Sequence, residues 1–224
     1  MKMSIDKIGL TLYDFLGYLL PGYTLILVCS LIESSFLDSD LFALSNINDN
    51  VFIFSIIAYF LGHISHGIGS AIKDRFYKQF SDRDKRLSRN VFERVRQAAQ
   101  EVYDINMDSE MKLNTLETYL LADSYIIAAG GSTERDILMA REGFHKASMV
   151  AFGFLCLAIS VSLFRGGMKI QIRPKEFINL SCGLTAVLSL ITLCAVLLFR
   201  KAFIFYNRIK INNTFLVFLA LVQK

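Results

Sequence analysis

Hydrophobic positions in this 224-residue chain gather in four long runs and do not spread at an even spacing. A helix that crosses the hydrocarbon core of a bilayer needs about 20 consecutive, mostly apolar residues. Four runs reach or approach this length: Phe15–Ile32, Val51–Ile72, Ala147–Phe164 and Phe177–Phe199. The pattern therefore predicts an all-α fold, a polytopic membrane protein with four transmembrane helices.

The polar stretch between the second and third runs, residues 73–146, has the amphipathic pattern of soluble helices. Apolar residues return at helical spacing in two groups: Phe92, Val95, Ala99 and Val102, then Leu113, Leu116, Leu120 and Ile127. Asn106–Ser109 gives a turn and N-cap signal between them, and Gly130-Gly131 ends the second helix. A third helix is expected to begin at Ser132 or Thr133 and to continue into the third span. We expect a helical cytoplasmic insert, folded as an antiparallel hairpin or a three-helix cap.

The tail, residues 200–224, combines basic residues with a final apolar run, Thr214–Val222. That run is too short to span a bilayer by itself, so it predicts an interfacial or docked helix. The chain is thus divided into four parts. An N-terminal interfacial segment and two spans (1–72) precede the insert (73–146), and the third and fourth spans (147–199) precede the tail.

Lysine and arginine positions set the expected orientation, because cytoplasmic loops are enriched in these residues. The loop Glu33–Asn50 has four acids and no Lys or Arg, whereas residues 73–146 carry 13 Lys or Arg and 13 acids. The insert and both termini are therefore expected in the cytoplasm. The loop Arg165–Glu176 is an exception, since it holds four Lys or Arg and lies outside in this topology. It either contacts lipid headgroups or senses an anionic surface ligand.

Small residues recur at four-residue spacing in two spans, which lets helix backbones approach closely. The second span holds two such pairs, Ala58/Gly62 and Ser65/Gly69. The fourth span has a face of hydroxyl side chains, Ser181, Thr185 and Ser189. We interpret these seven residues as helix-packing or oligomer contacts. The alternative for the hydroxyl face, or for the kink expected at Pro21, is the lining of a pore.

The three histidines of the chain fall at one expected membrane depth. His63 and His66 lie three residues apart and share a helix face. His145 stands at the start of the third span, close in sequence to Arg141 and Glu142. We interpret these five residues as a joint that couples the spans to the insert, with the histidines hydrogen-bonded to neighbouring helices.

No motif indicates catalytic chemistry. The sequence has no GxSxG, HExxH, P-loop or Rossmann pattern. The two paired histidines could seed a zinc site completed by Asp74, Glu142 or His145, but the spacing lacks the other features of a metal motif. The four cysteines lie singly within apolar runs and predict no disulfide framework or zinc ribbon. With a net charge of only +4, nucleic-acid binding has no support. We expect a protein that is not an enzyme and has no cofactor.

Three short motifs, Leu12–Gly22 (LYDFLGYLLPG), Tyr59–His63 (YFLGH) and Arg141–Phe144 (REGF), together resemble those of small four-span bacterial membrane proteins. Some of these accompany anti-phage defence operons, and the membrane subunit of the Kiwa system is one to compare. The resemblance implies a homo-oligomeric sensor of the bacterial inner membrane that recruits a cytoplasmic effector from the same operon. No functional residue is carried over, because the motifs are short.

The resulting hypothesis is a non-enzymatic inner-membrane sensor or scaffold that oligomerises through its spans and recruits a soluble partner through its insert. The alternative is a pore-forming effector that depolarises the cell. A membrane enzyme that uses the histidines is a third reading.

Overall fold

The computed structural model describes residues 5–36, 41–80, 89–104, 115–130, 133–173 and 175–223. Within them lie seven helices and two strands, in this order along the chain: α1 (Ile5–Phe36), α2 (Leu44–Asp49), α3 (Val51–Phe80), α4 (Arg89–Val102), α5 (Thr115–Ala128), α6 (Thr133–Phe164), β1 (Met168–Arg173), β2 (Glu176–Leu180) and α7 (Cys182–Val222). The chain forms two compact units. The first comprises residues 1–71 and 140–203, and the second comprises residues 72–139 and 204–224.

Four helices are long and apolar enough to cross a membrane, as the hydrophobic pattern predicts. The qualifying stretches are Gly17–Ser34 in α1, Val51–Ile72 in α3, Asp136–Phe164 in α6 and Cys182–Val222 in α7. The third begins further upstream than Ala147 because α6 starts at Thr133 and continues without a break, as expected for the third helix of the insert. The tail is not a separate helix, since α7 includes it.

An antiparallel β-hairpin lies between α6 and α7, where an all-α fold was expected. β1 pairs with β2 from Met168 opposite Leu180 to Arg173 opposite Glu176, with an irregularity after Gln171. The strands form because Met168–Arg173 alternates apolar and polar residues, a period of two that a helix does not have. The fourth helix therefore begins at Cys182 and not at Phe177, which belongs to β2.

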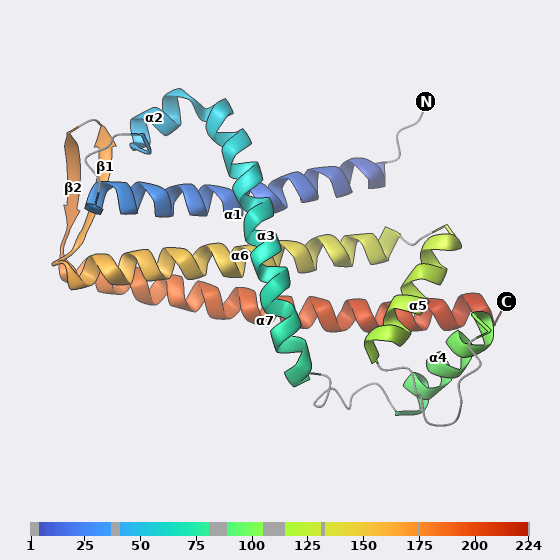
Figure 1. Ribbon diagram of the computed structural model, residues 1–224. Coiled ribbons are helices and arrows are strands. Elements are labelled where there is room, and N and C mark those ends of the chain that lie inside the picture. The colour runs from blue at the N-terminus through green and yellow to red at the C-terminus, as the bar shows by residue number, and fades with distance from the viewer. Residues whose placement is uncertain are drawn as a thin grey trace. The chain divides into compact units, whose positions relative to one another are not determined.

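The first unit is held together at the hairpin end by buried apolar side chains of α1, α6 and β1. Val28 and Leu31 pack with Leu155 and Ile159, and Met168 of β1 joins them. A second cluster, Ile26 of α1 with Phe54 and Ala58 of α3, fixes α3 on α1. Figure 1 shows α3 crossing α1 and α6 obliquely.

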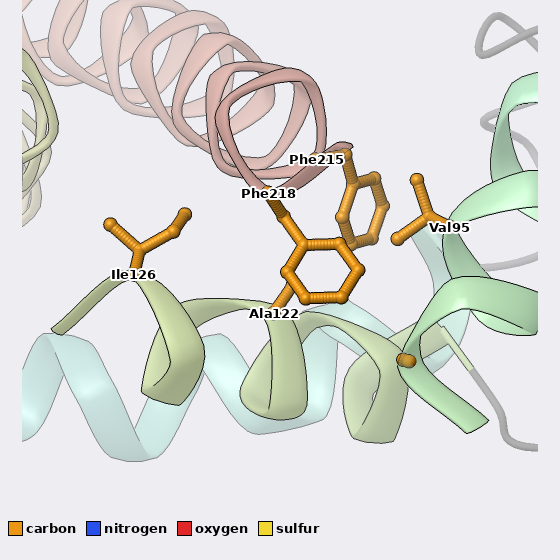
Figure 2. Close-up of a cluster of buried hydrophobic side chains, with 6 residues drawn as sticks. Val95, Ala122, Ile126, Phe215 and Phe218 are labelled. Carbon is orange, nitrogen blue, oxygen red and sulfur yellow. The ribbon is translucent and has the colours of Figure 1, made fainter. Parts of the chain in front are cut away.

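The second unit is a separate helical core built from the insert and the end of α7. Its buried side chains are Val95 and Ala99 of α4, Ala122 and Ile126 of α5, and Phe215 and Phe218 of α7. Figure 2 shows the two phenylalanines projecting from α7 toward the side chains of α4 and α5. The apolar run Thr214–Val222, expected to be interfacial or docked, is docked on the insert.

The predicted apolar face of α4 is buried at the centre of the helix, whereas the predicted apolar face of α5 is exposed. Val95 and Ala99 are fully buried. In α5 the buried positions are Thr118, Ala122 and Ile126, while Leu120 and Ile127 are 53% and 56% exposed. The prediction was wrong for these two because α5 is apolar on more than one side, so its sequence does not mark a single buried face. The predicted turn Asn106–Ser109 lies outside the described residues.

Candidate functional site

One stripe of small residues on α3 organises the first unit. Ala58, Gly62, Ser65 and Gly69 are all buried, and their spacing of four, three and four residues puts them on one face of the helix. The first pair meets α1 and the second pair meets α6. The sequence predicts these residues as packing contacts, and the structure uses all four within the chain.

The crossing of α3 with α1 is a backbone-to-backbone contact. A Cβ atom added to Gly22 would stand 2.8 Å from the Cα atom of Ala58. One added to Gly62 would stand 2.9 Å from the Cα atom of Tyr18. Real Cβ atoms do not approach this closely, so only glycine fits at either position. Beside the crossing, the hydroxyls of Tyr23 and Ser55 are 2.6 Å apart and share a hydrogen bond.

The crossing of α3 with α6 is polar. Ser65 Oγ donates a buried hydrogen bond of 2.8 Å to the carbonyl of Ala147. Lys146 is only 5% exposed, and its Nζ donates to Ser70 Oγ at 2.7 Å. Its aliphatic stem passes over Gly69, where an added Cβ would stand 2.6 Å from Cγ. Ionisable groups buried within apolar helices are costly and are functional candidates for that reason.

Lys146 was not among the residues singled out from sequence. The sequence signal that could have identified Lys146 is its position directly before Ala147, the first residue expected in the third span. In the structure these residues face Ser65 and Gly69. Glu142 is also buried, at 4% exposure, four residues before Lys146 on the same face of α6.

The histidines of the predicted joint lie among aromatic rings. The ring of Tyr18 stacks on His63, with 3.8 Å between ring centroids, and meets His66 edge to face at 5.8 Å. His66 also faces Gly143 of α6, where an added Cβ would stand 3.2 Å from Nε2. The joint therefore brings both His63 and His66 against one tyrosine, which was not among the residues predicted for the joint.

The other joint residues lie differently. His145 packs on Phe144 and Phe199, with ring centroids 5.0 and 5.9 Å away, while Arg141 is exposed. Among the described residues no three His, Cys, Asp or Glu side chains are grouped as a metal site would require. The side chain of Asp74, considered as a zinc ligand, lies outside the described residues.

The hydroxyl face of α7 makes its hydrogen bonds inside the first unit. Thr185 is fully buried, accepts the Met168 N–H at 3.1 Å and donates to the Ser181 carbonyl at 2.9 Å. Ser189 shares a 2.9 Å hydrogen bond with Ser160 of α6. Ser181 is exposed and caps the start of α7, because its Oγ accepts the Leu184 N–H at 3.4 Å. Two of the three hydroxyls thus attach α7 to β1 and α6.

The contacts described above hold helices in place against one another. Small residues hold α3 against α1 and α6, and buried polar groups fix the register of the second crossing. The chain matches no protein-family model, and no curated protein or solved structure is significantly similar to it. The function is therefore inferred from the residues and their arrangement.

Proposed function

We propose that this protein is a non-enzymatic multi-pass membrane sensor or scaffold whose second unit recruits a soluble protein partner. We further propose that the protein lies in a bacterial inner membrane with both termini in the cytoplasm and acts in anti-phage defence. The orientation is supported by the distribution of Lys and Arg, and the membrane and the defence role are supported by the resemblance. The observation that carries it is continuity. Helices α3, α6 and α7 each begin in one unit and end in the other without a break.

Continuous helices suit the transmission of a displacement from the membrane to a soluble partner. A turn or flexible loop at each unit boundary would absorb a small movement, whereas an unbroken helix passes it on. The crossings at Gly62 and at Ser65 attach α3 to α1 and α6. A stimulus that displaces one of these helices therefore also exerts a force on the helices packed against it.

The second unit offers a defined surface for a partner. Leu120 and Ile127 lie seven residues apart on one face of α5, and both are more than half exposed. Glu117 and Ser124 are exposed on the same face, Glu117 one turn before Leu120 and Ser124 between Leu120 and Ile127. Exposed apolar side chains bordered by polar ones are typical of protein interaction sites, and an apolar pair at this spacing fits a partner's helix or groove.

Partner capture tests the proposal. The protein, purified with the products of its neighbouring genes, is expected to retain one soluble partner. The double variant Leu120→Asp, Ile127→Asp should lose it, because two charges enter the apolar contact while the buried core of the unit is untouched. The control is Gln97→Asp on the exposed face of α4, which should retain the partner. Retention of the partner by the double variant, or its absence from the unaltered protein, would refute the proposal.

The proposed oligomer needs a different interface from the one expected from sequence. Ala58, Gly62, Ser65 and Gly69 are buried within the chain, so they are not available to a second copy. The outward face of α3, with Phe52 76% exposed and Phe60 63% exposed, is the better candidate. Membrane potential separates this proposal from a pore, since a scaffold leaves the potential intact during activity and a pore collapses it.

A further inference from the structure

The β-hairpin of the first unit has an outer edge, on strand β2. The sheet has two strands, and β1 packs on α1 and α2 while β2 lies on the far side of β1 (Figure 1). Residues 176–179 of β2 are exposed. Adjacent residues of a strand direct their N–H and C=O groups to opposite sides. About every second residue of β2 therefore presents a donor and an acceptor on the side away from β1, where another strand can pair.

Strand β2 has few of the features by which edge strands avoid such pairing. Lysine, proline and bulges are the usual ones, but β2 has the sequence EFINL, and the irregularity of the hairpin lies in β1, after Gln171. Phe177 and Ile178 are 44% and 47% exposed and lie on opposite faces of the strand. The edge thus offers main-chain groups together with an apolar side chain on each face.

This edge is unsuited to the hydrocarbon core of a bilayer. Open sheet edges do not occur there, because each unpaired main-chain group costs several kcal/mol. The hairpin joins the ends of two candidate spans, the one that ends at Phe164 and the one that begins at Cys182. In a membrane it would therefore lie in water beyond the spans, where lipid chains do not cover its apolar side chains.

The charges of the hairpin indicate what covers the edge. Residues 168–180 contain three cations and one acid, Lys169, Arg173, Lys175 and Glu176. Lys169 lies opposite Asn179 of β2, so the two share a face of the sheet, and the exposed Lys175 directly precedes β2. The acid lies 4.0 Å from Arg173. A second copy of the hairpin would bring the same positive charge and be repelled, whereas an acidic segment would be attracted.

We propose that β2 binds an extended acidic segment of another protein, which adds to the hairpin as a third strand. Main-chain hydrogen bonds along the outer edge of β2 provide the affinity, as in other cases of strand addition. Alternate side chains of the segment contact Phe177 or Ile178, and its carboxylates lie near Lys169 and Lys175. The inference rests on the proposed function, because it names the class of ligand to which the sensor responds.

Three synthetic peptides test the pairing with the full-length protein in nanodiscs, by fluorescence anisotropy. The acidic strand peptide TEVEVET should bind. Its counterpart TKVKVKT should bind about tenfold more weakly at low ionic strength, because two exposed charge pairs change from attraction to repulsion. TEVEVET with methylated backbone nitrogens keeps its charges but has no N–H donors, so it should not bind.

Amide exchange locates the bound peptide on the edge. Hydrogen–deuterium exchange of the same complex, resolved by residue, should become slower at every second amide of residues 176–180, because alternate N–H groups point away from β1. Exchange in α6 should not change. Contact through side chains alone would not produce this alternation.

A charge variant with a matched control tests the acidic preference. Lys169→Gln with Lys175→Gln should weaken binding of TEVEVET about threefold at low ionic strength, since two exposed charge pairs are lost. Arg200→Gln with Lys201→Gln removes two exposed cations of α7 in the same unit and should leave binding unchanged.

Four outcomes would overturn the proposal. They are equal binding of the acidic and lysine peptides, binding of the methylated peptide, equal losses in the two charge variants, and protection of β2 without peptide. Protection that rises with protein concentration would give the edge to a second copy, and protection that requires phosphatidylglycerol in the nanodisc would give it to the membrane surface. Capture of the soluble partner is measured separately in the same charge variant. A failed strand site with the partner retained is thereby distinguished from a failed scaffold function.

Discussion

Glu33 shows how one buried carboxylate can organise the chain beyond its own helix. It lies in the last turn of α1, is 4% exposed, and accepts the N–H groups of Leu41 and Phe42, at 3.0 and 2.6 Å. Glu33→Ala removes a charged acceptor shared by two backbone groups, and hydrogen bonds to charged groups contribute about 1.5–3 kcal/mol each. We expect a loss of about 2–4 kcal/mol in stability and faster amide exchange at Leu41 and Phe42, measured by hydrogen–deuterium exchange.

Asp49→Ala is the matched control for Glu33. Asp49 is an exposed acid at the end of α2, and exposed substitutions of this kind usually change stability by less than about 0.5 kcal/mol. Equal protection of the two amides in Glu33→Ala and the unaltered protein would show that the carboxylate does not order this segment.

The two glycines of the α1–α3 crossing give the sharpest residue-scale prediction. Gly22→Ala or Gly62→Ala puts a methyl group against the backbone of the opposite helix, so the helices must separate. Overpacking of this kind costs about 1–3 kcal/mol or more. Gly67→Ala on the same helix α3 is the control, because nothing lies within 4 Å of its added Cβ and alanine favours helix by about 1 kcal/mol.

Thermal unfolding in detergent measures both effects. The crossing glycines should lower the transition temperature and Gly67→Ala should leave it equal or higher. If all three variants unfold at the same temperature, close backbone packing is not what holds α3 against α1.

At the scale of elements, the β-hairpin depends on one side chain of α7. Thr185 accepts the N–H of Met168, the first residue of β1, so Thr185→Val leaves that buried donor without this acceptor. An unsatisfied buried group costs about 1–3 kcal/mol. We expect faster amide exchange in β1 and β2, with little change in α6.

Thr192→Val is the control for the hairpin prediction. The hydroxyl of Thr192 donates to the carbonyls of Leu188 and Ser189 within its own helix, so its loss should leave hairpin exchange unchanged. Equal exchange in the two variants would contradict a specific role for Thr185.

The elements differ in how far the sequence could predict them. The apolar runs identify the spans because length and composition suffice for a long helix. The hairpin was missed because the apolar residues of β2 after Glu176 continue almost directly into α7 and were counted in the fourth span, although Met168–Arg173 alternates with the period of a strand. The stripe of α5 was assigned to the wrong face because α5 is apolar on more than one side, so the spacing of its apolar residues does not mark a single buried face.

The sequence could predict which residues of α3 make close helix contacts, but not which residues of the other helices they contact. Small residues four apart on α3 indicate that other helices approach closely, yet no local signal says that Gly62 meets Tyr18 or that Ser65 meets Ala147. These pairs are separated by tens of residues in sequence and depend on the path of the whole chain. The same holds for the contacts of Tyr18 with His63 and His66, since they are set by the α1–α3 crossing.

At the scale of the whole molecule, the last residues complete the core of the insert. Phe215 packs near Phe92 and Tyr119, with ring centroids 6.1 and 6.4 Å away, and Phe218 near Tyr125 at 5.4 Å. The core of the second unit therefore includes the end of α7, a helix that begins in the first unit.

Phe218→Ala tests whether the second unit depends on this contact. Phe218 is fully buried in its core, and removing a buried phenylalanine side chain costs about 3–5 kcal/mol. Amide protection should fall in α4 and α5 but persist from Ala147 to Phe164 of α6, because the first unit has its own buried clusters. Leu216→Ala, at a position 57% exposed, should leave both units protected. Loss of protection in both units together would mean that the two units unfold as one and that the second unit has no stability of its own.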